Sequence, residues 1–553
     1  MNSNRLFLAA GILAAVVAAI ADLAGQGRKF YDDDPLAREP ETADASKVQD
    51  RDIVLAYDLV ENLFGTPGDS RKIRALNVNT IDEVPDSSWF TNRILERPLS
   101  IDEAVRGPMT GAGPAPGSMT VTRAKPSGVS AGFVLRDSVG VIWFVQFDAP
   151  GHDEAASGAS MVANKIFHAL GYWQTENHIA ELWPDRLSIG EKAVTETPSG
   201  KIRQLDRDDL AKLLKRAARQ PNGAYRILAS RGIANGRGRF RYYGTRSDDP
   251  NDIVAHEHRR ELRALNVFGA WTNLVDMKAK NTLDALVTEN GRTLLRHYLQ
   301  DVGSTFGTGA LGPREWDEGY ELLYESDPTW KRLVSGGFYL RPWQTMRYTE
   351  YRSIGRFEGD GFDPTKWKPR VPTAALLNAR ADDNFWAARR VMAFSDTLIR
   401  AIVKTGKYGD PAAESHLAEV LIKRRDKIGR AYLPAINPIV DPVLDSAVLT
   451  FGNAAVQAGV SAAPKGGYRA EWFVFNNATG ESTPLGVSAT SSALRMEAPR
   501  LPPAGVGAFV RIDVSAVDPP HPSWAVPVHL YFKRTVDGWQ LVGLERGPEG
   551  AEV

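Results

Sequence analysis

Two short polar runs, one from Asp276 to Asn281 and one from Asp301 to Gly303, carry the residue types best suited to chemistry. The first run holds an aspartate, then a lysine, then an asparagine, and the second begins with an aspartate. Phosphoryl transfer uses an aspartate that accepts a hydroxyl proton, with an asparagine and a second aspartate that hold metal against the phosphates. The two runs together therefore indicate metal-assisted phosphoryl transfer.

The segment between the two runs predicts a β-hairpin that positions them. Residues Thr282 to Glu289 and Arg292 to Gln300 are strand-like, and Asn290-Gly291 separates them. Asn-Gly between two apolar runs favours a type I′ turn, because both residues tolerate positive φ. We expect this hairpin to bring Asn281 at its beginning close to Asp301 at its end.

At these residues the chain resembles the protein-kinase-like superfamily, and most closely its atypical HipA-like, CotH-like and phosphatidylinositol-kinase-like branches. The resemblance implies that Asp276 is the catalytic base and that Lys278 contacts the transferred phosphate. It also implies that Asn281 and Asp301 bind the metal, Mg²⁺ or Mn²⁺. ATP or another nucleotide would be the cofactor.

The chain departs from the common protein-kinase pattern at two places near these residues. Leu274-Val275 stands where His-Arg precedes the aspartate, which argues against activation by a phosphorylated loop that docks on that arginine. Val302 replaces the phenylalanine of Asp-Phe-Gly, which is a mild apolar exchange.

The half of the site that would hold the nucleotide phosphates is altered. A kinase small lobe carries a lysine on its third strand, which pairs with a glutamate on the next helix. Here the matching strand, Trp143 to Asp148, has Gln146 at that position. The helix has Glu154 at its start and Ser160 in its first half, so the position of the paired glutamate is open. Glutamine adds no charge, and charge-assisted hydrogen bonds are roughly twice as strong as neutral ones. The candidate cofactor-binding residues are therefore Gln146 and Lys165 on the helix, with Lys125 as another source of charge.

The elements around these residues follow the order of a small lobe and a large lobe. Strand-like segments at 119–123, 132–135 and 141–147 precede a helix from Ala155 to Leu170. A helix from His256 to Val275 then leads into the Asp276 run, with its apolar residues spaced for one buried face. Further helices are expected at 384–405 and 411–428, and antiparallel strands at 468–475, 507–517, 526–534 and 539–544.

We therefore expect an α+β fold with a two-lobed, kinase-like arrangement. Its β-rich small lobe spans 119–240, and its helical large lobe with the candidate site spans 241–438. An irregular arm (25–118), which includes a helix at 53–64, precedes them, and a C-terminal antiparallel β-domain, sandwich-like, spans 439–553. Residues 1–24 are expected to be a signal peptide or membrane anchor.

The N-terminal segment and the composition limit location and partners. Leu6 to Ala21 is an apolar run shorter than the ~20 residues of a spanning helix, and Ala19-Ile20-Ala21 fits a cleavage site. A cleaved signal is favoured over an anchor, with a buried helix as the third alternative, so we expect periplasmic or extracellular export. A formal net charge of zero argues against a nucleic-acid partner. The absence of cysteine excludes thiolate catalysis, disulfides and cysteine-type zinc sites.

Three other segments carry weaker signals. Ser127 to Gly132 is glycine-rich, which fits a phosphate loop less well than an ordinary turn. Asn235 to Tyr243 is basic and aromatic, which suits contact with a phosphate or acidic substrate, or a solvated loop. His256-Glu257-His258 does not complete a zinc-protease motif, because position 260 is arginine.

Three functions remain open from the sequence. The first is an exported, atypical kinase-like phosphotransferase that depends on metal and nucleotide and acts on an unknown protein or small-molecule acceptor. The second is a pseudokinase-type binding scaffold, whose C-terminal β-domain makes the contacts. The third is a metal-dependent hydrolase that uses Asp276 and Asp301. A lysine close to Asp301 would favour the first, whereas Gln146 alone at the site would favour the second.

Overall fold

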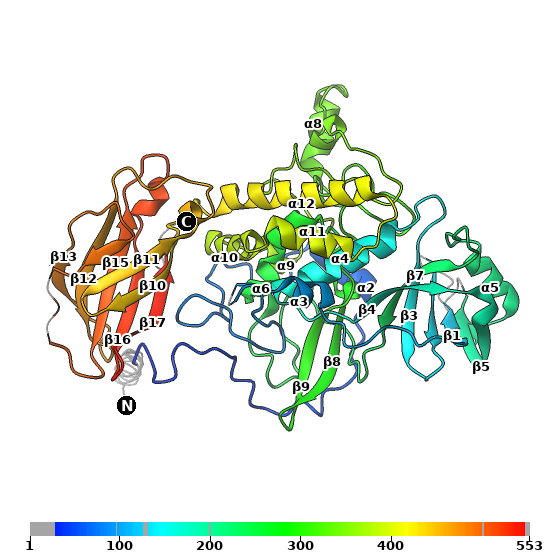
Figure 1. Cartoon of the computed structure of the whole chain (residues 1–553), viewed down its shortest axis with the longest axis horizontal. Coiled ribbons are helices and arrows are strands. Elements are labelled where there is room, and N and C mark those ends of the chain that lie inside the picture. Colours follow the sequence, from blue (N-terminus) through cyan, green and yellow to red (C-terminus); the bar gives the residue numbers. More distant parts are fainter. Residues whose placement is uncertain are drawn as a thin grey trace, which may run out of the picture. The chain divides into compact units, whose positions relative to one another are not determined.

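The computed structural model describes residues 28–95, 97–124, 131–197, 201–499, 501 and 503–547. These residues form a mixed α+β structure with 25% helix and 26% strand, so the predicted fold class is confirmed at that level. The chain divides into two compact units (Figure 1). The larger unit consists of residues 38–77 and 84–433, and the smaller one of the segment before Arg38, residues 78–83 and the chain from Pro434 onward.

The larger unit contains a seven-stranded sheet with the order β4-β7-β3-β2-β1-β5-β6. Strands β1, β2 and β3 lie where the sequence predicts them. Along β3, Trp143, Val145 and Phe147 are buried in the core, while Phe144 and Gln146 face the other side. The strands are β1 (Met119–Ala124), β2 (Gly132–Arg136), β3 (Ile142–Phe147), β4 (Asn177–Leu182), β5 (Leu187–Glu196), β6 (Ile202–Gln204) and β7 (Tyr225–Arg231).

Helix α4 (Ala155–Leu170) follows β3 with the bounds that the sequence predicts. It is buried along almost its whole length. Near its start, Ser157 donates from both its backbone nitrogen and its hydroxyl to Asp148, at 2.8 and 2.7 Å. These bonds tie the helix to the end of β3.

The predicted hairpin is confirmed as a two-stranded sheet of β8 (Thr282–Glu289) and β9 (Arg292–Leu299). The turn residues Asn290 and Gly291 have φ values of 50° and 76°, as a type I′ turn requires. The register pairs Thr282 with Leu299, so the beginning and the end of the hairpin lie side by side.

The prediction of two long helices is wrong, because each of the two segments is interrupted. The segment 256–275 forms η2 (His256–His258), α6 (Arg260–Arg263) and α7 (Leu265–Thr272), and Asn273 ends α7 in the left-handed conformation. The segment 384–405 divides into α10 (Ala381–Met392) and α11 (Asp396–Lys404), because the Ser395 hydroxyl caps a new helix by accepting from Leu398 N. Helix α12 (Pro411–Tyr432) runs past its predicted end.

The remaining short elements of the larger unit belong to the arm and to insertions. They are α2 (Leu55–Phe64), α3 (Ile101–Arg106), η1 (Pro184–Arg186), α5 (Arg207–Leu214), η3 (Ala279–Asn281), α8 (Ser326–Val334), η4 (Pro342–Thr345) and α9 (Ala374–Leu377). Within the described part of the chain, no helix has the length and apolar character to cross a membrane.

Buried ion pairs hold the arm against the helices. Arg259 is completely buried and pairs with Glu39 of the arm at 3.0 Å. Arg260 and Arg263, also completely buried, bind Asp383 of α10. Removing one partner of a buried pair costs about 3–5 kcal/mol, so this network fixes the arm in place.

The smaller unit has two antiparallel sheets and is completed by two N-terminal segments. Phe30 packs on Phe475 and Tyr531, and its backbone exchanges two 2.8 Å hydrogen bonds with the Asn477 side chain. Leu544 N donates to Thr80 O at 2.8 Å. The elements are β10 (Ile439–Asp445), β11 (Val448–Asn453), α13 (Ala454–Gln457), β12 (Tyr468–Phe475), β13 (Ser482–Val487), β14 (Arg495–Glu497), β15 (Phe509–Ala516), η5 (Pro522–Ala525), β16 (Val528–Arg534) and β17 (Trp539–Arg546).

Candidate functional site

The loop between α7 and β8 holds Asp276, Lys278 and Asn281 in mutual contact. Asn281 Nδ2 donates to the backbone oxygen of Asp276 at 2.7 Å and to its Oδ2 at 3.2 Å. Lys278 Nζ lies 2.7 Å from Asp276 Oδ1. The aspartate is therefore oriented by an amide on one side and by an ammonium group on the other.

These contacts decide the charge of Asp276. Burial raises the pKa of this carboxyl, but the neighbouring Lys278 ammonium and the hydrogen bonds from Lys278 and Asn281 outweigh burial and lower the pKa below its usual value. The carboxylate is therefore ionised at neutral pH, as an acceptor of a hydroxyl proton must be.

Asp301 lies beside this loop, as the hairpin predicts. Its backbone nitrogen donates to Asn281 O at 3.1 Å. Its Oδ1 accepts from Gly303 N at 3.0 Å, which fixes the carboxylate at the end of the hairpin. The expectation that Asn281 and Asp301 come together is thus confirmed.

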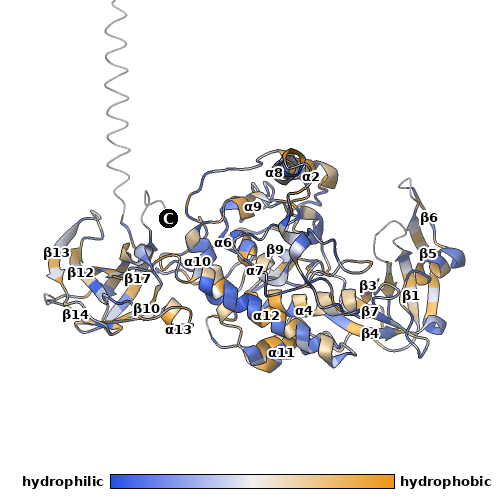
Figure 2. Ribbon diagram, turned by 90° about the horizontal axis from the view of Figure 1, so that it is seen from above, coloured by the Kyte–Doolittle hydropathy of each residue, from blue (hydrophilic) through white to orange (hydrophobic). Residues whose placement is uncertain are grey.

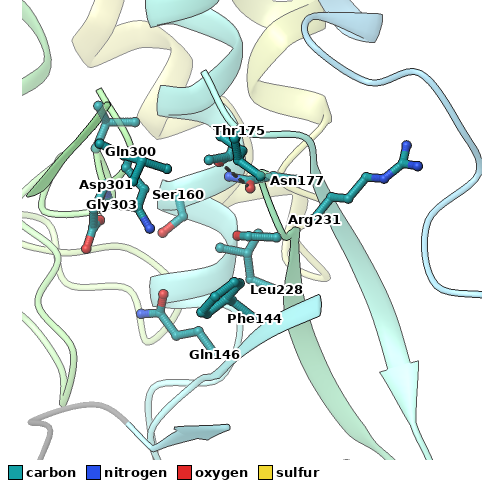
Figure 3. A pocket seen from close by; sticks show the side chains of 14 residues that line it. Phe144, Gln146, Ser160, Thr175, Asn177, Leu228, Arg231, Gln300, Asp301 and Gly303 are labelled. Carbon is teal, nitrogen blue, oxygen red and sulfur yellow. Dashed lines mark hydrogen bonds between the residues drawn. The ribbon is translucent and has the colours of Figure 1, made fainter. Parts of the chain in front are cut away.

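A pocket of about 240 Å³ opens next to Asp301 (Figure 3). The sheet contributes Phe144 and Gln146 from β3 and Leu228 from β7, and α4 contributes Ser160. The hairpin contributes Leu283 and the run from Gln300 to Gly303. Further lining residues are Thr175, Asn177, Ser230, Arg231 and Ile233. Phe144 and Gln146 are two positions apart in the sequence. Because side chains alternate along a strand, this spacing predicts that both lie on the same face of β3.

Of the two candidate cofactor-binding residues, Gln146 lines the pocket and Lys165 does not. Lys165 is buried and donates from Nζ to the backbone oxygen of Arg106 at 2.6 Å. Burial lowers its pKa to about 8. Lys125 and residues 127–130 of the glycine-rich segment lie outside the described residues.

The pocket is poor in positive charge. Among the described residues that line it there is no lysine, and Arg231 is the cationic one. Arg231 pairs with Glu176 at 3.2 Å, and in Figure 3 its guanidinium group points away from Gln146 and Asp301. Neutral donors and acceptors, from Gln146, Ser160 and Asn177, make up most of the polar wall.

The donor set suits a metal ion that takes part of its shell from a ligand. No group of three or more His, Cys, Asp or Glu residues that could hold a metal occurs among the described residues. Asn281 and Asp301 supply one amide and one carboxylate. Mg²⁺ is typically bound by one or two carboxylates together with substrate phosphates and water. By donor type, Asn281 and Asp301 therefore suit a Mg²⁺ ion that takes its remaining ligands from phosphate oxygens and water.

Two other sequence signals have structural roles. The segment 235–243 binds the arm: Arg237 donates to Val48 O at 3.0 Å, and Arg241 lies 3.7 Å from Asp58. It is therefore neither at the pocket nor a solvated loop. His256 is buried, with Nε2 at 2.8 Å from Asp252.

In the smaller unit, a serine lies next to a histidine and the histidine lies near an aspartate, as in a hydrolase triad. The sequence analysis did not predict this arrangement. Ser461 Oγ lies 3.1 Å from His521 Nε2. His521 Nδ1 lies 3.9 Å from Asp518, which is too long for a hydrogen bond. Ser461 N donates to Ala455 O, so this backbone amide is already engaged and does not serve an oxyanion. This arrangement is therefore not the candidate site.

Comparison with known proteins gives no relative from which a function can be transferred. No protein-family model, curated protein or solved structure matches the chain. The functional assignment therefore depends on the residues and the geometry described above.

Proposed function

We propose that the larger unit is a kinase-like phosphotransferase of atypical type, dependent on a nucleotide and on Mg²⁺ or Mn²⁺. The observation that carries this proposal is the contact set of Asp276, Lys278 and Asn281, held directly beside Asp301 at the edge of a pocket. These are the residue types, in the same order, that phosphoryl transfer uses.

The arrangement of elements around the pocket supports the proposal of a two-lobed, kinase-like fold. The seven-stranded sheet and α4 correspond to a small lobe and supply Gln146 and Ser160. The hairpin β8–β9, joined to α7, corresponds to the large lobe and supplies Leu283 and Asp301. A pocket lined from both sides is where a nucleotide lies between two lobes.

The apolar part of the pocket suits a nucleobase. Phe144, nearly half exposed, lines the pocket together with Leu228, Ile233 and Leu283. Bases stack on aromatic rings with little dependence on sequence, at about 1–3 kcal/mol per base. We assign the base to this side and the phosphates to the side of Gly303 and Asp301.

Each polar residue then has one role. Asp276 orients the acceptor hydroxyl and accepts its proton, and Lys278 steadies the transferred phosphate. Asn281 and Asp301 would hold the metal, which when bound neutralises charge on the phosphates. Gln146 and Ser160 would donate hydrogen bonds where common kinases place a charged pair.

A pseudokinase-type scaffold that binds without transfer is the second candidate. One observation favours it: no lysine occurs among the described residues of the pocket wall. The intact Asp276 loop favours transfer, because binding alone does not need a general base. Under either function, export through residues 1–24, which lie outside the described residues, is part of the proposal, and the acceptor is a protein hydroxyl or a small molecule.

Ligand-dependent thermal unfolding tests the proposal. A ligand that binds only the native state raises the unfolding midpoint by mass action. We expect ATP to raise it in the presence of Mg²⁺ or Mn²⁺ but not with EDTA, and we expect Asp301→Ala to abolish the rise. Asp276→Asn should keep the rise and lose transfer of the γ-phosphate. An unchanged metal-dependent rise in Asp301→Ala would overturn the site, and a rise without turnover in the wild type would favour the scaffold.

A further inference from the structure

Helix α2 presents a stripe of apolar side chains outward. Its buried positions are polar, Asp58 and Asn62, which is the reverse of an ordinary surface helix. The exposed apolar side chains at its start and along it are Val54, Tyr57, Val60 and Phe64. Their spacing of three or four residues places them on one stripe of the helix.

This stripe continues onto α8 and the turn that follows it. The Phe64 ring lies 5.2 Å from the ring of Tyr324, and Tyr324 shares a surface hollow with Trp330 and Leu333 of α8. Val334 is 83% exposed and Phe338 is 89% exposed. Figure 2 shows hydrophobic colouring on both helices. We use the name α2–α8 surface for the following exposed apolar residues: Val54, Tyr57, Val60, Phe64, Tyr324, Trp330, Leu333, Val334, Phe338 and Leu340.

The α8 part of the α2–α8 surface combines a basic chain segment with a hollow that also holds Asp317, Glu321 and Glu325. Two of these carboxylates are paired, Glu321 with Arg341 and Glu325 with Lys368. From Trp330 to Arg347 the sequence has no aspartate or glutamate. Its basic residues are Lys331, Arg332, Arg341 and Arg347.

We propose that the α2–α8 surface docks on an anionic lipid bilayer. A contiguous exposed apolar patch marks an interaction site, since scattered single residues suffice on ordinary surfaces. Aromatic and aliphatic residues flanked by lysine and arginine suit the bilayer interface, where each basic residue adds about 1 kcal/mol with anionic lipids.

Docking would bring the bilayer next to the candidate site. Helix α2 packs against η3, which ends at Asn281. The docking inference itself does not depend on phosphoryl transfer, because it rests on exposure and charge alone.

The absence of cysteine from the chain allows a position-specific test. Val334→Cys in the full chain introduces one thiol for an environment-sensitive fluorophore, and Val139→Cys, at the exposed β2–β3 turn, is the matched control. We expect anionic phosphatidylglycerol vesicles to raise and blue-shift the emission at position 334, with no change at 139. Vesicles of phosphatidylcholine alone should give a weaker response.

The controls separate docking from other causes. Attachment through the N-terminal segment alone would sediment the protein with vesicles but leave the probe at 334 unchanged, and this result would overturn the proposal. A response at 334 that depends on protein concentration without vesicles would also overturn it, in favour of a second copy of the chain. Adding Phe338→Asp, at a side chain that is 89% exposed, should reduce the vesicle response at 334 several-fold.

Discussion

Gly303 lies against Ser160 so closely that a Cβ atom at position 303 would stand 2.3 Å from Ser160 Oγ. The two residues belong to the Asp301 run and to α4, so their contact sets the distance between the proposed metal ligand and the opposite wall of the pocket.

Gly303→Ala should therefore destabilise the larger unit by about 1–3 kcal/mol, the usual cost of overpacking. Ser160→Ala should restore most of this loss, because the next nearest side-chain atoms lie at 3.3 and 3.4 Å. Thermal unfolding of the two single variants and the double variant measures the coupling. Strictly additive effects would show that the contact does not set the packing here.

The acid limb of transfer should depend on Lys278. In Lys278→Met, burial is no longer offset by the ammonium group, so the pKa of Asp276 rises. Because the ionised carboxylate is the form that accepts the proton in the proposed reaction, the acid limb of the pH–rate profile should move to higher pH, with a loss of maximal rate of about 10²–10⁴. Lys280→Met is the neighbouring control, and an acid limb that moves equally in both variants would count against this role of Lys278.

Gln146→Lys should strengthen nucleotide binding. It places a cation on the pocket face of β3, and charge-assisted bonds to phosphate exceed neutral ones by about 1 kcal/mol or more, or roughly five- to tenfold in affinity. Ile142→Lys, on the same face of β3 but outside the pocket, is the matched control. Titration calorimetry with ATP and Mg²⁺ measures both, and equal affinity in Gln146→Lys and the wild type would place the phosphates elsewhere.

The buried Lys165 should make stability depend on pH in the alkaline range. Its pKa is lowered by burial to about 8, whereas an unfolded lysine titrates near 10.4. Between about pH 8 and 10 the unfolded state binds more protons, so the wild type should gain stability as pH rises. Relative to Lys165→Met, the free energy of unfolding should rise by about 1.4 kcal/mol for each unit by which the folded and unfolded pKa values of Lys165 differ. Denaturant unfolding of both proteins at pH 7.5, 9 and 10 measures it, and a constant difference would contradict the assignment.

Local patterns in the sequence predict the parts of the site that depend on neighbouring residues. The Asn290-Gly291 turn predicts the hairpin and hence the meeting of Asn281 and Asp301. The apolar period predicts α4. The same helical period places Lys165 on another side of α4 than Ser160, because five positions turn the helix by about 140°. Since Ser160 lines the pocket, Lys165 does not.

Long-range contacts are what the sequence does not predict. At the break before Arg260, the backbone nitrogen of Arg260 donates to the side chain of Asn77, which lies far away in the sequence. The contact between Gly303 and Ser160 joins residues far apart in sequence, so no local pattern encodes it. From its helical period alone, the apolar stripe of α2 would be predicted to be buried. The structure shows that it is exposed.

The place of Phe30 in the smaller unit has a consequence for biosynthesis. Its partners, Phe475 and Tyr531, are synthesised long after Phe30, so the hydrophobic cluster around Phe30 cannot close until the ribosome has passed them. Contacts of such high sequence separation favour slow folding of the smaller unit.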